Sequence, residues 1–455
     1  KQQLVVVPTK TAFHLLQPLL VHHFPHRVIA LDSDAPKAQF WAHWQRVREE
    51  RAAVILTTKR GIFAPFRALA TVYIDSVTDD SHKQWDQDPR YDARAVARTL
   101  AEQFGAQLVL LDAAPSLAIH DDRRIATVSF PHFAQKRCVV DMRRAARSTG
   151  PLSGEAQAFL QKKSFPMLVF FNRVGYARVT ECAECRWHFA CFSCGTHLVY
   201  YAGTQAYECS RCRTKAVLPS RCPRCGSTRL RPRSWGLERL EEIVRSALPH
   251  SRVLRYDRTT RASSIVDADV VIATEQLLTS SRLPNFQSIL IPSLDNMLQP
   301  HEYAAAERAY LILERSMALG AEHSTVLLQT YDPEQMVVRA IVQHEPELLY
   351  GEERKLRKTL LLPPKATLIK LLLRSTTPQT AERKARLLTQ HLQKSLGRFV
   401  RLEGPFVPRT MPTATNRRIL LLRLLGHDIP ATLQRELSEL SHEWHVDPDP
   451  LTLDI

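Results

Sequence analysis

Four C-x-x-C pairs between residues 182 and 225 constrain this chain more than any other feature of its sequence. The eight cysteines are Cys182, Cys185, Cys191, Cys194, Cys209, Cys212, Cys222 and Cys225. Each C-x-x-C turn directs two thiolates at one point, which is half of a tetrahedral zinc site. The sequence therefore predicts two structural Zn²⁺ ions, which would hold together a segment that has few apolar residues of its own.

Paired cysteines have two rival interpretations, a disulfide framework and a redox site. Disulfide frameworks suit short secreted chains, and a redox C-x-x-C normally occurs once beside a strand–helix unit.

The pairing of the four turns is open between two arrangements. The 14 residues between Cys194 and Cys209 favour a nested one, with the inner two pairs in one site and the outer two in another. Sequential pairing would leave five residues between Cys185 and Cys191.

Positive charge is concentrated around these cysteines. The whole chain carries 62 Lys or Arg and 46 Asp or Glu, a formal charge of +16, and residues 136–233 hold 18 basic and 5 acidic residues, or +13. A basic region of this kind attracts polyanions, of which nucleic acid is the commonest in a cell. The alternatives are a solvated surface that serves solubility, and cations that neutralise zinc–thiolate centres.

Outside the cysteine segment, apolar runs alternate with amphipathic stretches. Ten runs are predicted to be buried strands: LVVVPT, RVIALD, AAVILTT, TVYID, QLVLLDAAPS, PMLVFFNRVG, RVLRYD, DVVIATE, SILIPS and STVLLQT. This rhythm is typical of parallel sheets covered by helices, so the fold class is α/β. From about residue 346 the pattern changes to that of a small α+β domain. The sequence contains no run of eighteen apolar residues, so it predicts no membrane span.

Five segments follow from this pattern. They are a first lobe (1–145), the start of a second lobe (146–180), a double-zinc domain (181–233), the remainder of the second lobe (234–345) and a C-terminal α+β domain (346–455). The chain begins KQQLVVVP, without methionine or a signal peptide, so we expect a natural segment upstream of Lys1.

The order of several motifs resembles the primosomal protein N′ (PriA) family of replication restart helicases. The motifs include TTKRGIFAPF, HKQWDQDPRYDAR, FFNRVGYA, the four cysteine pairs, ATEQLLTSSRLPNF and the closing VDPDP. The resemblance implies two RecA-like helicase lobes, with the zinc segment inserted in the second. It also implies that the zinc segment helps to bind forked DNA and partner proteins, and that the phosphate loop and further DNA-binding domains precede Lys1.

The motifs that hydrolyse ATP in this family are altered. Asp75-Ser76-Val77-Thr78 stands where the family has Asp-Glu-Glu-His, so Asp75 is the residual motif position, and Leu111-Asp112-Ala113-Ala114-Pro115 stands for Gly-Ser-Ala-Thr-Pro. In the second lobe, Ala273 and Thr279-Ser280 replace family residues, and the stretch LILERSMALG lacks the paired arginines. Losing a charge-stabilising arginine alone costs orders of magnitude in rate. The sequence therefore predicts a helicase-like fold whose ATPase, with its ATP and Mg²⁺, has been lost.

Binding to DNA is then the expected activity. The predicted contact residues all lie in the zinc segment: Arg186, Trp187, Arg211, Arg213, Lys215, Arg221, Arg224, Arg229, Arg231 and Arg233. The arginines and the lysine would contact phosphates and Trp187 would stack on a base. Trp187 and Phe189 have an alternative role as the small apolar core of the zinc domain.

The sequence thus favours a cytoplasmic, nucleoid-associated replication restart factor that binds forks and single-strand/duplex junctions. The resemblance adds single-strand-binding protein and primosome proteins as expected partners, and no membrane. One alternative is an active ATP-dependent 3′→5′ helicase whose motifs have drifted. Another is a zinc-ribbon adaptor that binds proteins.

Overall fold

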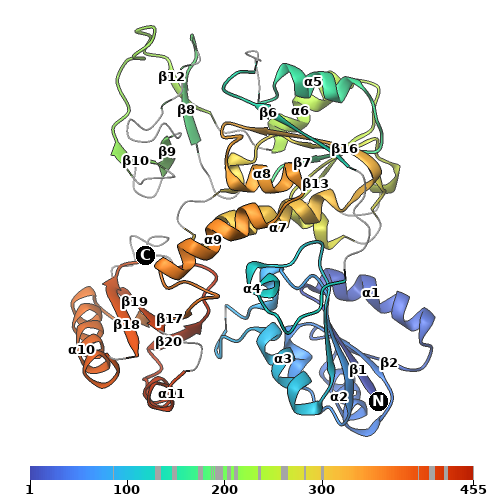
Figure 1. The fold of residues 1–455 in the computed structure, drawn as a ribbon, viewed down its shortest axis with the longest axis vertical. Coiled ribbons are helices and arrows are strands. Elements are labelled where there is room, and N and C mark those ends of the chain that lie inside the picture. Colours follow the sequence, from blue (N-terminus) through green and yellow to red (C-terminus); the bar gives the residue numbers. More distant parts are fainter. Residues whose placement is uncertain are drawn as a thin grey trace.

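The computed structural model arranges the chain as two α/β lobes, a small cysteine-bearing domain and a C-terminal domain (Figure 1). It describes residues 1–85, 87–128, 135–145, 151–172, 178–185, 187, 189, 198–201, 206–209, 214–233, 237–257, 265–280, 283–298, 302–397, 399–408, 416–424 and 429–453. Within these ranges, no helix is both long enough and apolar enough to cross a membrane.

Lobe 1 is built on a five-stranded parallel sheet in the order β2-β3-β1-β4-β5. Its strands are β1 (Gln2–Val6), β2 (Val28–Leu31), β3 (Val54–Thr57), β4 (Leu69–Ile74) and β5 (Gln107–Leu110). Its helices are α1 (Lys10–His23), α2 (Lys37–Glu49), α3 (Ala93–Phe104) and α4 (Leu117–His120), with 3-10 turns η1 (Lys59–Phe63) and η2 (Asp80–His82). All five strands predicted for this lobe are present.

Helices cover both faces of this sheet, because successive side chains of a strand point to opposite faces. Phe13 of α1 packs against Leu56 on one face, whereas Ala97 of α3 packs with Ile55 on the other. Burial on both sides explains why the strands appear in the sequence as continuous apolar runs. The loops at the carboxyl ends of β4 and β5 are left to meet lobe 2.

Lobe 2 has a six-stranded parallel sheet in the order β13-β14-β7-β15-β16-β6. Its strands are β6 (Lys136–Asp141), β7 (Met167–Phe170), β13 (Val253–Tyr256), β14 (Val270–Ala273), β15 (Phe286–Ile291) and β16 (Gly320–Thr330). Its helices are α5 (Gly154–Gln161), α6 (Leu237–Ala247), α7 (Ala305–Met317), α8 (Met336–Gln343) and α9 (Glu347–Thr359), with turns η3 (Ile265–Asp267), η4 (Glu275–Thr279) and η5 (Asp295–Met297).

Two boundaries differ from the sequence prediction. Lobe 1 was predicted to extend to residue 145, but β6 pairs in parallel with β16 and forms the edge of the lobe 2 sheet. The C-terminal domain was predicted to begin at residue 346, but α9 packs against α7 and α8 of lobe 2. Both segments carry apolar residues that suit either neighbour, so a local pattern cannot assign them to one domain.

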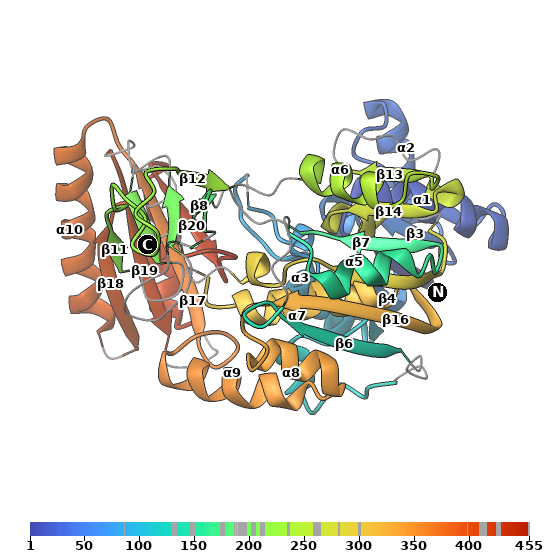
Figure 2. The ribbon, with the colours of Figure 1, turned by 90° about the horizontal axis from the view of Figure 1, so that it is seen from above.

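The cysteine-bearing domain, which follows β7, is an antiparallel sheet in the order β11-β10-β9-β8-β12. Its strands are β8 (Arg178–Cys182), β9 (Leu198–Tyr201), β10 (Ala206–Cys209), β11 (Lys215–Ala216) and β12 (Leu230–Arg233). This domain and the C-terminal domain lie on the same side of the two lobes (Figures 1 and 2).

The C-terminal domain is a four-stranded antiparallel sheet in the order β18-β19-β17-β20, with two helices. Its elements are β17 (Thr367–Arg374), α10 (Pro378–Leu396), β18 (Val400–Phe406), β19 (Arg417–Leu424), α11 (Ala431–Ser438) and β20 (Trp444–Pro448). It is joined to lobe 1 by a buried ion pair, in which Lys83 Nζ lies 3.2 Å from Asp447 Oδ1. The predicted fold class, two α/β lobes with an inserted cysteine domain and a small α+β domain, is confirmed.

Candidate metal centre and lobe interface

Four cysteine side chains converge in the cysteine-bearing domain. The thiols of Cys182, Cys185, Cys222 and Cys225 all lie within 4.8 Å of one another. Antiparallel pairing sets this geometry, because β12 runs beside β8 with Leu230 opposite Cys182. The two C-x-x-C turns, one following β8 and the other preceding β12, are thereby brought together.

The cluster fits a structural zinc ion. A Zn–S bond of about 2.3 Å in a tetrahedron separates two sulfurs by about 3.8 Å. The Sγ atoms of Cys182 and Cys225 are 3.5 Å apart, as are those of Cys185 and Cys222. The backbone N–H of Cys185, followed by that of Glu184, lowers the pKa of the Cys182 thiol to about 6, which favours the thiolate that binds metal.

This cluster combines the two outer cysteine pairs, the combination that nested pairing requires for one of its two sites. Cys191, Cys194 and Cys212 lie outside the described residues, and Cys209 is described by its backbone alone, at the end of β10. The second zinc ion therefore stays a prediction.

The predicted DNA contacts differ in how their charges are placed. Lys215, Arg221 and Arg224 are exposed, and within the described part of the chain no ion pair engages them. Arg229 is exposed but pairs with Glu184 at 2.5 Å. Arg186, Arg211 and Arg213 lie outside the described residues, and the description of Arg231 and Arg233 is limited to the backbone of β12.

Trp187 is partly buried in the cysteine-bearing domain. Its ring is 5.8 Å from that of Phe189, and both belong to an apolar cluster with Leu198 and Tyr207. The carbonyl of Trp187 also accepts a hydrogen bond from the N–H of Cys182. The packing described here is the alternative role that the sequence left open for this residue.

The positions that the family resemblance assigns to ATP hydrolysis in lobe 1 lie where the lobes meet. Asp75 follows β4, and burial raises the pKa of its carboxyl group. The other motif residues bond to each other, since Asp112 Oδ2 accepts from the backbone N–H of Thr78 at 2.8 Å and from its hydroxyl at 2.6 Å. The loops after β4 and β5 are thus tied together inside lobe 1.

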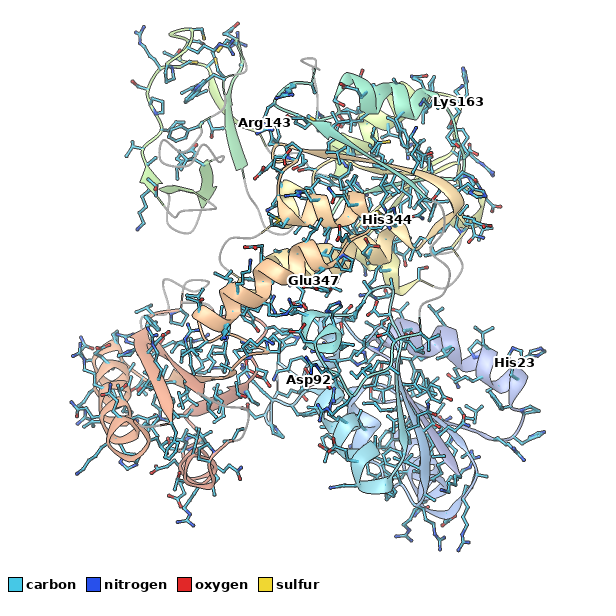
Figure 3. All side chains as sticks on the ribbon, in the orientation of Figure 1. His23, Asp92, Arg143, Lys163, His344 and Glu347 are labelled. Carbon is cyan, nitrogen blue, oxygen red and sulfur yellow. The ribbon has the colours of Figure 1, made fainter. Side chains whose placement is uncertain are left out.

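Side chains from lobe 2 complete this interface. Arg315 of α7 lies 3.5 Å from Asp79 and 3.6 Å from Asp112, and Arg308 lies 3.2 Å from Asp80. These three aspartates all belong to lobe 1. In Figure 3, side chains of both lobes meet around α9, which begins at Glu347.

A second group of contacts lies around α4. Glu307 Oε1 accepts the backbone N–H of Leu117 at 2.6 Å, and its other oxygen pairs with Arg357 at 2.7 Å. Asp121 binds Arg354 and Lys365, each at 2.9 Å. The hydrogen bond from Arg354, before all other influences, holds the pKa of Asp121 well below its usual range.

Negative charge dominates the middle of the interface. Burial is the main cause of raised pKa values at four carboxyl groups, those of Asp75, Asp80, Glu275 and Glu302. Each of the four is also repelled by at least one neighbouring carboxylate. The attraction of Arg308 opposes this rise at Asp80, Glu275 and Glu302.

Sequence reasoning missed Arg315 as an interface residue, although it noted the stretch in which Arg315 lies. It also missed Lys83 and Asp447, which are 364 positions apart. The signal available in the sequence was weak: Arg315 lies on a helix, α7, that also carries Glu307, Arg308 and Glu314, and nothing in the sequence sets it apart from them.

Two parallel α/β lobes that meet through strand-end loops, with a four-cysteine domain inserted in the second, define a two-lobed α/β protein with a candidate zinc site. Within that class the sequence is similar to Replication restart protein PriA. The chain is 27% identical over 470 residues to PriA of Haemophilus influenzae and 25% identical over 491 residues to that of Synechocystis, alignments that cover 96% and 99% of the chain. With PriA of Thermotoga maritima it shares 26% identity over 371 residues, or 77% of the chain. The chain is thus PriA-like over most of its length.

The chain spans 50% to 63% of the length of these relatives. No family model matches it. Among solved structures, helicase Lhr of Mycobacterium smegmatis bound to single-stranded DNA and AMP-PNP aligns with a TM-score of 0.39 and 12% identity, over 76% of this chain and 42% of that one. The DUF1998 helicase MrfA bound to DNA and AMPPNP aligns with a TM-score of 0.36 and 12% identity, over 77% of this chain and 44% of that one. At these scores neither likeness bears on the function of this chain.

Proposed function

We propose that this chain belongs to a PriA-type replication restart factor that binds forked or single-stranded DNA and nucleates primosome assembly without hydrolysing ATP. The similarity to PriA along as much as 99% of the chain carries the restart role. Such a factor would act in the cytoplasm on the nucleoid, with single-strand-binding protein and primosome proteins as partners.

The DNA-binding part of the proposal is supported by exposed cations beside the metal cluster. Arg221 and Arg224 flank Cys222 and Cys225, so the turn that binds the ion also fixes the backbone that carries both arginines. Phosphate contacts of this kind position a protein on DNA without reading its sequence. They suit a factor that recognises junctions by shape.

The loss of ATP hydrolysis is supported by the charges at the lobe interface. A motor needs a carboxylate to orient water and an arginine that faces the transferred phosphate. Here Thr78 stands at the position of the family's histidine and bonds to Asp112, while Arg315 contacts carboxylates.

The first test is ATP hydrolysis by the full-length protein, with and without forked DNA. We expect no turnover above that of a buffer blank in either condition. DNA-stimulated hydrolysis would instead support the alternative of an active 3′→5′ helicase.

The second test is the salt dependence of binding to a labelled model fork, measured by fluorescence anisotropy. Replacing Arg221 and Arg224 by glutamine should make the slope of log K against log [salt] shallower by about 0.7 to 0.9 for each lost phosphate contact, thus about 1.4 to 1.8 for both. The matched control replaces Lys162 and Lys163, two exposed lysines after α5 on the far side of lobe 2 (Figure 3), and should leave the slope unchanged. Wild-type binding that does not depend on salt would favour the protein-binding adaptor.

A further inference from the structure

Arg315 makes contacts that its position in a motor-like fold does not predict. It lies on α7 of lobe 2 and its side chain is 9% exposed, yet both carboxylates that it approaches belong to lobe 1. One of them, Asp112, is 3% exposed and is already fixed by two hydrogen bonds from Thr78. The arginine therefore meets a preorganised carboxylate, not a mobile surface group.

In nucleotide-driven motors, an arginine from the facing element contacts the transferred phosphate, so that closure of the site depends on the ligand. Here the negative partner of Arg315 is supplied by lobe 1 itself. Asp79 and Asp112 follow β4 and β5, at the carboxyl ends where α/β sheets usually bind ligands. An internal ion pair of this kind forms without a ligand.

Neighbouring contacts connect the same two lobes. The Leu117 N–H donates to Glu307, and the Tyr350 hydroxyl donates to the carbonyl oxygen of Pro115. Because Leu117 belongs to lobe 1 and Glu307 to α7, this amide hydrogen bond breaks if the lobes separate. The Thr78 N–H, by contrast, bonds within lobe 1, to the carboxylate that Arg315 approaches.

We propose that Arg315 is a built-in tether, which holds the two lobes together through Asp79 and Asp112 in the absence of any nucleotide. The lobes then form one rigid base for the cysteine-bearing domain, whether or not DNA is bound. Removing one member of a buried ion pair leaves the other uncompensated, which makes separation of the elements much easier.

Amide hydrogen exchange in the full-length protein tests this tether. In the Arg315→Gln variant, the Leu117 amide should exchange roughly ten- to a hundredfold faster than in the wild type, because breaking a buried pair is costly. The Thr78 amide and the amides within the β15–β16 pair, whose hydrogen bonds each lie within one lobe, should keep their wild-type rates. The Arg315→Lys variant, which retains the charge, should give an intermediate rate.

The matched control is Arg255→Gln. Arg255 also approaches two carboxylates, those of Glu241 and Asp257, but all three residues lie in lobe 2. This variant should leave the Leu117 rate unchanged. An unchanged Leu117 rate in Arg315→Gln would overturn the proposal.

If Arg315→Gln disturbs lobe 2 as a whole, Asp79→Asn decides the question from the other side of the interface. It should accelerate exchange at Leu117, and wild-type exchange in this variant would overturn the tether. Adding Mg-ATP to the wild type should leave the Leu117 rate unchanged. Slower exchange with nucleotide would mean that a ligand, not Arg315, closes the lobes. The tether and the proposed function can fail independently of each other. Amide exchange tests the tether, whereas ATP turnover and fork binding test the proposed function.

Discussion

The cysteine-bearing domain and the lobe interface use charge in opposite ways. In the cysteine-bearing domain, Arg221 and Arg224 are exposed, and the described residues offer them no ion pair. At the lobe interface, Arg315 is buried against two aspartates of the other lobe. The first region keeps its cations available for a ligand, whereas the second uses them to hold the protein together.

Different sources of stability account for this contrast. Within the described residues, the apolar core of the cysteine-bearing domain is a small cluster around Phe189 and Leu198, so a metal ion must supply most of its folding energy. Arg221 and Arg224 are then not needed as ion-pair partners that stabilise the domain. The lobes have large cores of their own, and their loops can use ion pairs to fix one lobe on the other.

Breaking the metal centre should have the largest effect. In Cys222→Ser the site loses a buried ligand, and structural zinc sites contribute on the order of 10 kcal/mol to folding. Zinc content, measured by elemental mass spectrometry, should fall by one equivalent per chain relative to the wild type, and the cysteine-bearing domain should become sensitive to protease. The control, Cys138→Ser, changes a cysteine of β6 outside the cluster and should keep the wild-type zinc content. A full zinc complement in Cys222→Ser would contradict the assigned ligand set.

Breaking the ion pair between lobe 1 and the C-terminal domain should have a smaller effect. Lys83 is 1% exposed and contacts both Asp447 and the carbonyl of Pro448, so Lys83→Met should lower the free energy of unfolding by roughly 3 kcal/mol. The same change at Lys384, whose pair with Glu443 is about one-third exposed, should cost less than about 1 kcal/mol. Urea unfolding of the two variants measures the difference, and equal losses would mean that burial of the pair does not matter.

The sequence predicted what depends on local periodicity. All five strands of lobe 1 were found because they are buried on both faces and appear as unbroken apolar runs. The four cysteine pairs were found because their spacing is fixed by metal geometry. The pairing of β8 with β12 then brings the outer pairs together, as the nested arrangement requires of one site.

Contacts between distant segments were not predicted. Arg315 pairs with Asp79, 236 positions away, and no period or spacing links the two. The edge strand β6 was missed for a related reason, since its partner β16 follows almost two hundred residues later. Trp187 could equally have been a stacking residue or a core residue, because the sequence does not say on which side of a small sheet an aromatic ring lies.

The smallest effect should come from removing one repulsive charge at the lobe interface. Burial is the main cause that raises the pKa of Glu275 above that of a free glutamate, and repulsion from Asp79 and Asp80 adds to it. A carboxyl group with a raised folded pKa holds its proton more tightly in the folded state than in the unfolded state. Its charged form therefore lowers stability at neutral pH, and the loss is recovered as the pH falls through the folded pKa.

Glu275→Gln should consequently raise the free energy of unfolding at pH 7 by about 0.5 to 1 kcal/mol, because the neutral amide keeps the size of the side chain without its charge. The advantage over the wild type should shrink as the pH falls from 7 through the folded-state pKa of Glu275, since the wild-type carboxyl group becomes protonated there. Comparing the two proteins at each pH cancels the titration of other groups, including His82, whose pKa is lowered by burial. The matched control is Glu352→Gln, at an exposed glutamate of α9 that pairs with Lys355, and it should give no comparable gain in stability at pH 7. If Glu275→Gln destabilised the protein at pH 7, this carboxylate would be a favourable partner of Arg308, and the interface would be balanced in charge instead of crowded with negative groups.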